Sequence, residues 1–491
     1  MSRIRSLFGH SALYMAANLL QRGLSFLLIP LYSRYFSTAE FGAMDMLYQL
    51  AVTLALLTSL GLPQGLVRGF YLAGDSGEVM PDEDRRKLLG ALVTFLFPFA
   101  LVTTGIMLAF AGPISHALFR DEGQAHWIRL TALLYLAMIL QQLPLQLYKT
   151  EQRSRVFAGW SLASFVLVAG GNLYLIMVLK WGLPGMLWGN LIGVGLTSIV
   201  LTVLLIPKLS LNWEWARLAP LFAFGLPMLP NLLCRKVLEI ANRYMLPYWQ
   251  GLSEVGLFSM GARIAAVMDV FLLVPFLYAW QPFFYSIAKH ADAPAIFARV
   301  THYFFLLLLC IFLALQVFQA PMLHFLGHGK FDDAGPVVSF LVLAVMFNGL
   351  QYCVSAGIHL KRKLPAEMAI MAAAAALNLI LNLFLIPKLG ARGAAAATAV
   401  SYFAYLSGTF LLSQKHYYVH YLWGRAAGVT LAAAGAYALL KWRSTWPVET
   451  AALAGFLLAG PILDLWRHGE LRQALEYLDR KRRKLSGGGP R

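Results

Sequence analysis

Residues 231–244 read NLLCRKVLEIANRY and lie inside one of the longest apolar stretches of the chain. The stretch is apolar enough for a membrane span, yet it carries Arg235, Lys236, Glu239 and Arg243 within nine positions. Charged side chains at the centre of a span cost about 2.5–3.5 kcal/mol on insertion scales, so they normally face a partner or a water-filled cavity. We therefore expect a membrane helix with a functional polar face.

The whole chain has the composition of a polytopic membrane protein. Of its 491 residues, 59% are hydrophobic and 13% are charged, and apolar runs of 18 or more residues recur along it. The three cysteines lie in apolar segments and show no disulfide or metal-ligand spacing. The net charge of +17 is typical of basic cytoplasmic loops, and we expect no binding of nucleic acid.

Fourteen segments have the length and hydropathy of membrane helices, which predicts an all-α fold. They are residues 11–33, 43–67, 88–111, 126–148, 156–179, 183–206, 219–246, 255–284, 301–326, 335–359, 365–387, 390–413, 421–440 and 447–465. If the N-terminus is cytoplasmic, 26 Lys and Arg side chains fall in inner loops and ends and nine in outer loops. This asymmetry predicts that both termini are cytoplasmic.

The stretch at 231–256 has a counterpart at 18–42, with a change of offset from 213 to 214 in the turn. The matched positions are Asn18 with Asn231, Arg22 with Arg235, Glu40 with Glu254, Gly42 with Gly256, Asp45 with Ser259 and Gln49 with Arg263. A second echo matches Gly182 with Gly390 and Gly185 with Gly393. These matches predict an internal duplication.

Six predicted helices separate the two copies, so both copies run in the same direction across the membrane. We predict two six-helix lobes, residues 1–207 and 208–415, then two helices within 416–465 and a basic cytoplasmic tail, 466–491. Parallel repeats of this kind occur in transporters whose lobes rock around a central site.

The polar residues of the predicted helix 219–246 lie on one face, within an arc of about 140° at 100° per residue. The predicted helices 11–33, 43–67 and 255–284 carry smaller polar faces, which favours a central cavity lined by these four helices. The candidate substrate-binding residues are Arg22, Arg235, Lys236, Arg263, Asn18 and Asn231. Because arginine is a planar, permanently charged donor suited to phosphate, they indicate an anionic substrate such as a pyrophosphate headgroup.

Acidic residues in the spans have a different interpretation. Asp45, Glu239 and Asp269 are candidates for ion coupling or charge balance, and Glu239 can serve only to neutralise Arg235. Arg243 lies near the outer end of its span, where a snorkelling side chain is the simpler explanation. Asn172, Asn190, Asn378 and Asn382 are more typical of hydrogen bonds between helices than of ligand binding.

The chain resembles the polysaccharide-transporter branch of the multidrug/oligosaccharidyl-lipid/polysaccharide exporter superfamily, the lipid-linked oligosaccharide flippases. The resemblance covers most of residues 10–415. It rests on Asn18 and Arg22 in the opening span, on YFSTAEFG (35–42) leading into LLTSLGLPQGLVRGFY (56–71), on LSEVGLFSMGARIAAVMDVFLL (252–273), and on the two GxxG pairs at 182–185 and 390–393.

This resemblance implies a bacterial inner-membrane protein that moves undecaprenyl-pyrophosphate-linked sugars, as repeat units of O-antigen, capsule or exopolysaccharide, to the outer leaflet by alternating access. It implies a cationic cavity whose phosphate-binding residues map onto Arg22, Arg235 and Arg263. Many relatives have twelve helices. Fourteen is similar to the lipid II flippases, whose extra pair helps form a groove for the lipid tail, so export of a peptidoglycan precursor is the alternative.

Other functions fit the sequence less well. A multidrug antiporter should have intramembrane acids dominating its first lobe, where only Asp45 qualifies, and a membrane enzyme should have clustered catalytic residues in a large loop or domain. We expect no catalytic residue, no metal site and no cofactor, with Na⁺, H⁺ or the membrane potential as the energy source. The expected partners are the lipid-linked substrate, the bilayer and a polysaccharide polymerase, and the expected state is a monomer.

Overall fold

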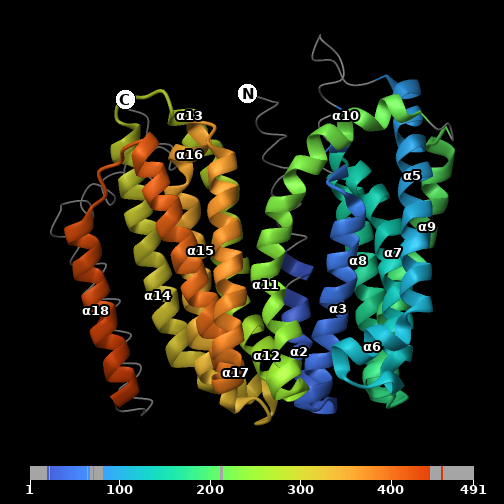
Figure 1. The fold of residues 1–491 in the computed structure, drawn as a ribbon, viewed down its shortest axis with the longest axis horizontal. Coiled ribbons are helices and arrows are strands. Elements are labelled where there is room, and N and C mark those ends of the chain that lie inside the picture. The colour runs from blue at the N-terminus through green and yellow to red at the C-terminus, as the bar shows by residue number, and fades with distance from the viewer. Residues whose placement is uncertain are drawn as a thin grey trace, which may run out of the picture. The chain divides into compact units, whose positions relative to one another are not determined.

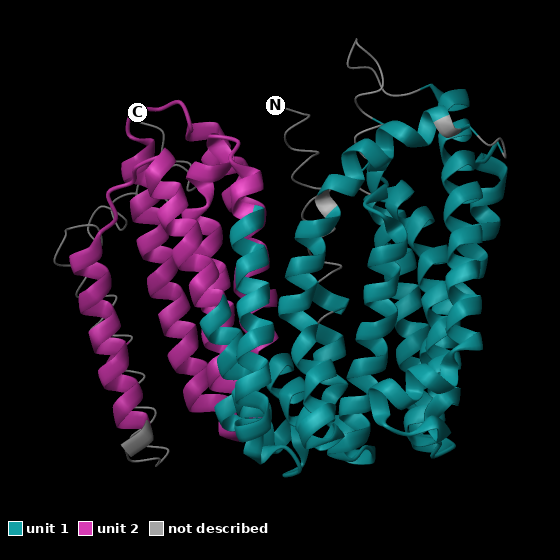
Figure 2. Cartoon of the chain, in the orientation of Figure 1, with its two compact units in different colours: residues 1–263, 323–337, 368–401 teal, residues 264–322, 338–367, 402–491 magenta. Residues whose placement is uncertain are grey.

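The structure is a computed structural model that describes residues 19–21, 23–62, 65–66, 70, 81–210, 214–442 and 455–456. Within these ranges all regular elements are helices, as expected for an all-α polytopic membrane protein. Contacts divide the chain into two compact units (Figure 2). Unit 1 comprises residues 1–263, 323–337 and 368–401, and unit 2 comprises residues 264–322, 338–367 and 402–491.

Unit 1 contains the helices of the first part of the chain (Figure 1). These are α2 (Ile29–Tyr35), α3 (Thr38–Ser59), α5 (Asp82–Ala109), α6 (Ala111–Phe119), α7 (Ala125–Thr150), α8 (Ser154–Leu173), α9 (Gly182–Leu205), α10 (Trp215–Gly225) and α11 (Leu229–Gln250). A π-helical turn, Tyr174–Val178, extends α8, and short 3₁₀ turns occupy Glu122–Gln124, Ile206–Lys208, Leu226–Met228 and Asp332–Ala334.

Unit 2 contains most of the later helices (Figure 1). α13 (Val274–Ile287), α16 (Ala356–Leu360) and α18 (Trp423–Trp442) lie wholly within it. Four helices pass from one unit to the other: α12 (Leu252–Met268), α14 (Ala293–Gly327), α15 (Gly335–Val354) and α17 (Leu364–His416). A π-helical segment, Asp269–Leu273, joins α12 to α13.

Among the described residues, nine helices are long and apolar enough to cross a membrane, or ten if the bent pair α10 and α11 forms one span. Two of the predicted spans, 365–387 and 390–413, lie in α17, which breaks at Gly390 with a φ of 55°. The first predicted span is described only from residue 19. Apart from residues 455–456, the last predicted span and the tail 466–491 lie outside the described residues. The lobe boundaries stay a prediction.

Two predicted boundaries differ from the observed ones. The helix predicted to begin at 43 begins at Thr38, because Ser37 and Glu40 form a capping box whose polar first turn carries no hydropathy signal. The helix predicted at 219–246 bends by 49° between α10 and α11, where Pro227 lies in a 3₁₀ turn. Residues 219–225 therefore belong to a separate amphipathic helix, α10.

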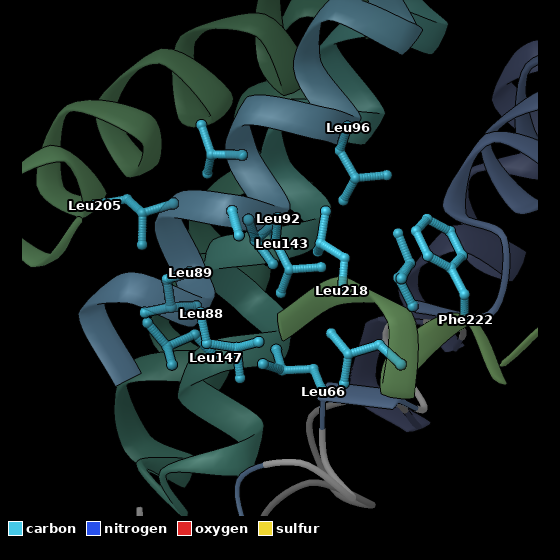
Figure 3. Packing of buried hydrophobic residues seen from close by; sticks show 14 residues of the cluster. Leu66, Leu88, Leu89, Leu92, Leu96, Leu143, Leu147, Leu205, Leu218 and Phe222 are labelled. Atoms are coloured by element: carbon cyan, nitrogen blue, oxygen red, sulfur yellow. The ribbon is translucent and has the colours of Figure 1, made fainter. Parts of the chain in front are cut away.

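Leucine side chains hold α10 against the N-terminal bundle (Figure 3). Leu218 and Phe222 of α10 are buried in a cluster with Leu88 and Leu92 of α5 and Leu147 of α7. α7 also packs against α3, α8 and α9, and its buried Tyr135 hydroxyl lies 2.6 Å from the Thr58 hydroxyl of α3. This packing fixes the position of α3, which carries the first residue of the candidate site.

Candidate functional site

A buried ionic cluster joins α3, α11 and α12. The Asp45 carboxylate of α3 accepts a hydrogen bond of 2.5 Å from Nε of Arg243 on α11 and one of 2.7 Å from the Ser259 hydroxyl on α12. Arg263, one turn further along α12, places Nη2 at 3.8 Å from the other Asp45 oxygen. Two arginines thus surround one carboxylate, which leaves an excess of positive charge.

Both arginines are held by further contacts. Arg243 is 9% exposed, donates from Nη1 to the backbone carbonyl of Glu239, and lies 5.3 Å from the centre of the Phe258 ring. The Arg263 guanidinium lies 4.9 Å from the centre of the Phe41 ring. Its Nε is buried and has no hydrogen-bond partner among the described residues. Arg263 is therefore the less completely satisfied of the two.

The internal duplication explains why these side chains meet. Asp45 and Ser259 occupy matched positions of the two copies, and they contact each other directly. One turn earlier, the matched glycines Gly42 and Gly256 also meet. A Cβ on Gly42 would lie 2.8 Å from the Gly256 nitrogen, and a Cβ on Gly256 would lie 2.0 Å from the carbonyl oxygen of Thr38. The helices α3 and α12 therefore cross where the two copies face each other, as a two-fold relation requires.

A second pair of polar contacts lies further along the same helices. Lys236 of α11 donates to the Glu239 carboxylate at 3.0 Å and lies 3.5 Å from the side-chain oxygen of Gln49 on α3. The Lys236 side chain is 15% exposed and the Glu239 side chain 44% exposed. The polar face predicted for residues 231–244 thus makes contacts with α3 along two levels.

The predicted site residues fall into three groups. Asp45 and Arg263 are brought together, and Lys236 and Glu239 form an ion pair on α11. Arg235 and Asn231 are half-buried on α11, and Asp269 is half-buried in the π-helical segment that begins unit 2. Asn18 and Arg22 lie outside the described residues. The roles assigned to all of these residues stay predictions.

One interpretation is wrong and one partner was missed. Arg243 does not snorkel, because its guanidinium is buried against Asp45. The contact seen for Glu239 is with Lys236, three residues away, instead of a pairing with Arg243 four residues away. The sequence signal for Arg243 was present, since it lies on the same polar arc as Arg235, but its partner is on another helix.

Asparagine side chains connect neighbouring helices, as their spacing predicts. The Asn172 amide donates to Asn190 at 3.0 Å and lies 3.3 Å from the Tyr32 hydroxyl. In the later part of unit 1, Asn382 donates to Asn378 and to Asn242, and Asn242 donates to Thr398 at 2.7 Å. All four groups of this second network are uncharged and buried. They link α11 to the two halves of α17.

Contacts at the α2–α3 turn hold this end of unit 1 together. Lys330, in the segment 323–337, donates to the backbone carbonyls of Ser33, Arg34 and Phe36 at 2.8, 3.1 and 3.0 Å. The Glu254 carboxylate accepts a hydrogen bond from the Ala391 nitrogen, just after the break at Gly390. Glu40, its match in the first copy, lies beside Gly182, where α9 begins. The paired glycine and glutamate motifs therefore meet in both copies.

Unit 2 contains an apolar groove of about 730 Å³ between α14, α15, α17 and α18. Its lining is almost entirely aliphatic and aromatic and includes Phe305, Leu350, Phe403, Leu411, Trp423 and Leu431. α18 corresponds to the first helix of the C-terminal pair that the sequence places outside the duplication. A long hydrocarbon chain is the kind of ligand that such a groove can bury.

Comparisons with known proteins agree with this architecture. A model of the polysaccharide biosynthesis protein family matches residues 9–288. No curated protein matches the chain. The lipid II flippase MurJ in an inward closed conformation superposes with a TM-score of 0.71 at 14% identity, covering 94% of this chain and 99% of that one.

Multidrug transporters share the fold less closely. An outward-facing multidrug resistance MATE family transporter of the MOP superfamily gives a TM-score of 0.55 at 14% identity, covering 84% of this chain and 94% of the other. The Vibrio cholerae MATE transporter VcmN gives 0.54 at 14% identity, covering 84% and 96%. At these identities the likeness is one of fold.

Proposed function

The chain belongs to the polysaccharide biosynthesis protein family, and on that premise we propose that it is a flippase for a lipid-linked oligosaccharide. In this proposal the substrate is an undecaprenyl-pyrophosphate-linked repeat unit of O-antigen, capsule or exopolysaccharide. The protein moves it across the bacterial inner membrane by alternating access. The family and the fold shared with a lipid II flippase support this proposal.

The observation that carries the proposal is the charge inside the spans. Away from their ends, α3, α11 and α12 bring together four basic side chains, Arg235, Lys236, Arg243 and Arg263, and two acidic ones, Asp45 and Glu239. A cavity for cationic drugs needs the opposite sign. A pyrophosphate provides several charged oxygens for guanidinium groups to bind. In this proposal Arg22, the repeat match of Arg235, supplies a further phosphate contact.

The groove of unit 2 supports a lipid-linked substrate. Its apolar lining and its volume of about 730 Å³ suit a prenyl chain that remains apolar while the headgroup crosses. We propose that α18 forms one wall of this site for the lipid tail. The protein acts as a monomer in this scheme and delivers its substrate to a polymerase. Imposing Na⁺, H⁺ and electrical gradients one at a time identifies the energy source.

A complementation experiment tests the function. In a strain lacking its own exporter of lipid-linked repeat units, the wild-type chain should restore surface glycan. Arg22→Ala and Arg235→Ala, separately and together, should abolish export at normal levels of folded protein. Lys289→Ala, which removes an exposed lysine, is the matched control and should export normally. Normal export by the double variant would refute the role of this cationic face.

Lipid II export is the second candidate, because the fold likeness to the lipid II flippase covers nearly the full length of both chains. The same variants can be placed in a strain depleted of its lipid II flippase. Rescue of growth there, without restoration of surface glycan in the first strain, would assign the peptidoglycan precursor. Restoration of surface glycan alone would assign the oligosaccharide.

A further inference from the structure

The site contains its own anion. Asp45 is the carboxylate that both Arg243 and Arg263 face, and its oxygens occupy the position that an incoming phosphate oxygen would need in order to bind the same two guanidinium groups. The Asp45 side chain is 9% exposed and is held on the second copy of the repeat by Ser259 at 2.7 Å. A single carboxylate satisfies this pair of arginines only partly.

The incomplete satisfaction lies on Arg263. Its closest approach to Asp45 is 3.8 Å, which is beyond hydrogen-bond distance, and its buried Nε has no hydrogen-bond partner among the described residues. The Arg263 side chain is 30% exposed, against 11% for Arg243. An anion with more oxygens than a carboxylate could therefore bind both guanidinium groups at once, and Arg263 would be the group it meets first.

The same carboxylate ties two copies of the repeat together. Asp45 is on α3, whereas its partners Arg243, Ser259 and Arg263 are on α11 and α12. Once Asp45 loses these partners, the remaining polar contacts between α3 and α11 include the Lys236–Gln49 contact at 3.5 Å and the bond from the Tyr244 hydroxyl to the Met46 carbonyl at 3.1 Å. Both are neutral-acceptor contacts and weaker than the ion pair.

We infer that Asp45 is a competing internal anion, which holds Arg243 and Arg263 until the pyrophosphate of the substrate displaces it. This inference rests on the proposed function and adds a coupling step to it. Displacement of Asp45 releases α3 from α11 and α12, so binding of the anion itself favours separation of the two copies. Asp45 is thus a positioning residue, and the substrate class it selects is a pyrophosphate.

Binding of inorganic pyrophosphate to the purified full chain, measured by isothermal titration calorimetry, tests this competition. Asp45→Asn removes the competing charge and should bind pyrophosphate about tenfold more tightly than the wild type. Asp45→Glu keeps the charge and should bind like the wild type. The double variant Asp45→Asn with Arg263→Gln should lose the gain. Equal or weaker binding by a monodisperse Asp45→Asn protein would overturn the inference.

Two further arms keep the test decisive. Asp84→Asn makes the same chemical change at a carboxylate that pairs with Arg217 at 3.0 Å outside the spans, and it should leave binding unchanged. If Asp45→Asn does not fold, Ser259→Ala removes one hydrogen bond to the carboxylate and should tighten binding about threefold. No gain with Ser259→Ala would then overturn the inference.

The outcome is separable from that of the proposed function. Tighter pyrophosphate binding by Asp45→Asn in a protein that exports no lipid-linked substrate would uphold the competition and refute the flippase. Export by the wild type without any gain in Asp45→Asn would refute the competition alone.

Discussion

At the scale of single residues, the account depends on how buried charge is balanced. Asp45 is surrounded by Arg243, Ser259 and Arg263, and Arg243 is the most buried of the basic groups. A buried carboxylate that loses its closest cation keeps its desolvation cost without the compensating attraction. The ion pair therefore affects stability as well as binding.

Arg243→Ala should strongly destabilise the protein. Removal of one partner from a buried ion pair typically costs about 3–5 kcal/mol, so the midpoint of thermal unfolding in detergent should fall clearly. The double variant Asp45→Asn with Arg243→Gln leaves no unpaired charge and should recover part of the loss. Arg217→Ala, at a more exposed pair with Asp84, is the control. A double variant no more stable than Arg243→Ala would contradict this explanation.

The sequence predicts part of this cluster. The charges of residues 231–244 predict one polar face, and the duplication matches Asp45 with Ser259, which are found in contact. The pairing of Arg243 with Asp45 could not be predicted, because it depends on how far α11 is rotated against α3. Periodicity within one helix gives its face, whereas it does not give the residue opposite that face.

At the scale of elements, the crossing of α3 and α12 positions the site. Gly42 and Gly256 allow the two backbones to approach, and any side chain there meets backbone atoms of the other helix. Small residues at such crossings are common between membrane helices. The sequence predicts the glycine match but not the contact, which requires the two copies to face each other across α3 and α12.

Gly256→Ala should disrupt this crossing. Its Cβ would lie 2.0 Å from the Thr38 carbonyl oxygen, which is backbone and cannot move without shifting α3. We expect a lower unfolding midpoint and reduced export. Gly195→Ala, where nothing lies within 4 Å of the new Cβ, should be neutral or slightly stabilising because alanine favours helices. Equal unfolding midpoints for the two variants would show that the close approach is not needed.

At the scale of the whole molecule, the sequence predicts the class of fold and the approximate helices. Hydropathy recovers nearly all the described spans, and it fails where backbone geometry decides, at the bend before α11 and at the capped start of α3. The groove in unit 2 could not be predicted, because it depends on how α14, α15, α17 and α18 are spaced.

The groove carries a separate prediction about the lipid tail. Ala427 lines it on α18, and Ala427→Trp should fill part of its volume. Translocation of a substrate with a full-length prenyl chain should slow, whereas binding of inorganic pyrophosphate should be unchanged, because the change is confined to unit 2. Ala432→Trp, on the same helix outside the groove lining, is the control. Equal translocation rates in both variants would remove the groove from the mechanism.

The central claim is most directly tested by reconstituting the purified chain into vesicles with a fluorescent undecaprenyl-pyrophosphate oligosaccharide. A membrane-impermeant quencher measures how fast the label in the inner leaflet becomes accessible. The account predicts rapid loss of protection with the wild-type chain, and protection close to that of protein-free vesicles with the Arg22→Ala, Arg235→Ala double variant. Equal rates for the double variant and the wild type, or no translocation by a folded wild-type chain, would contradict it.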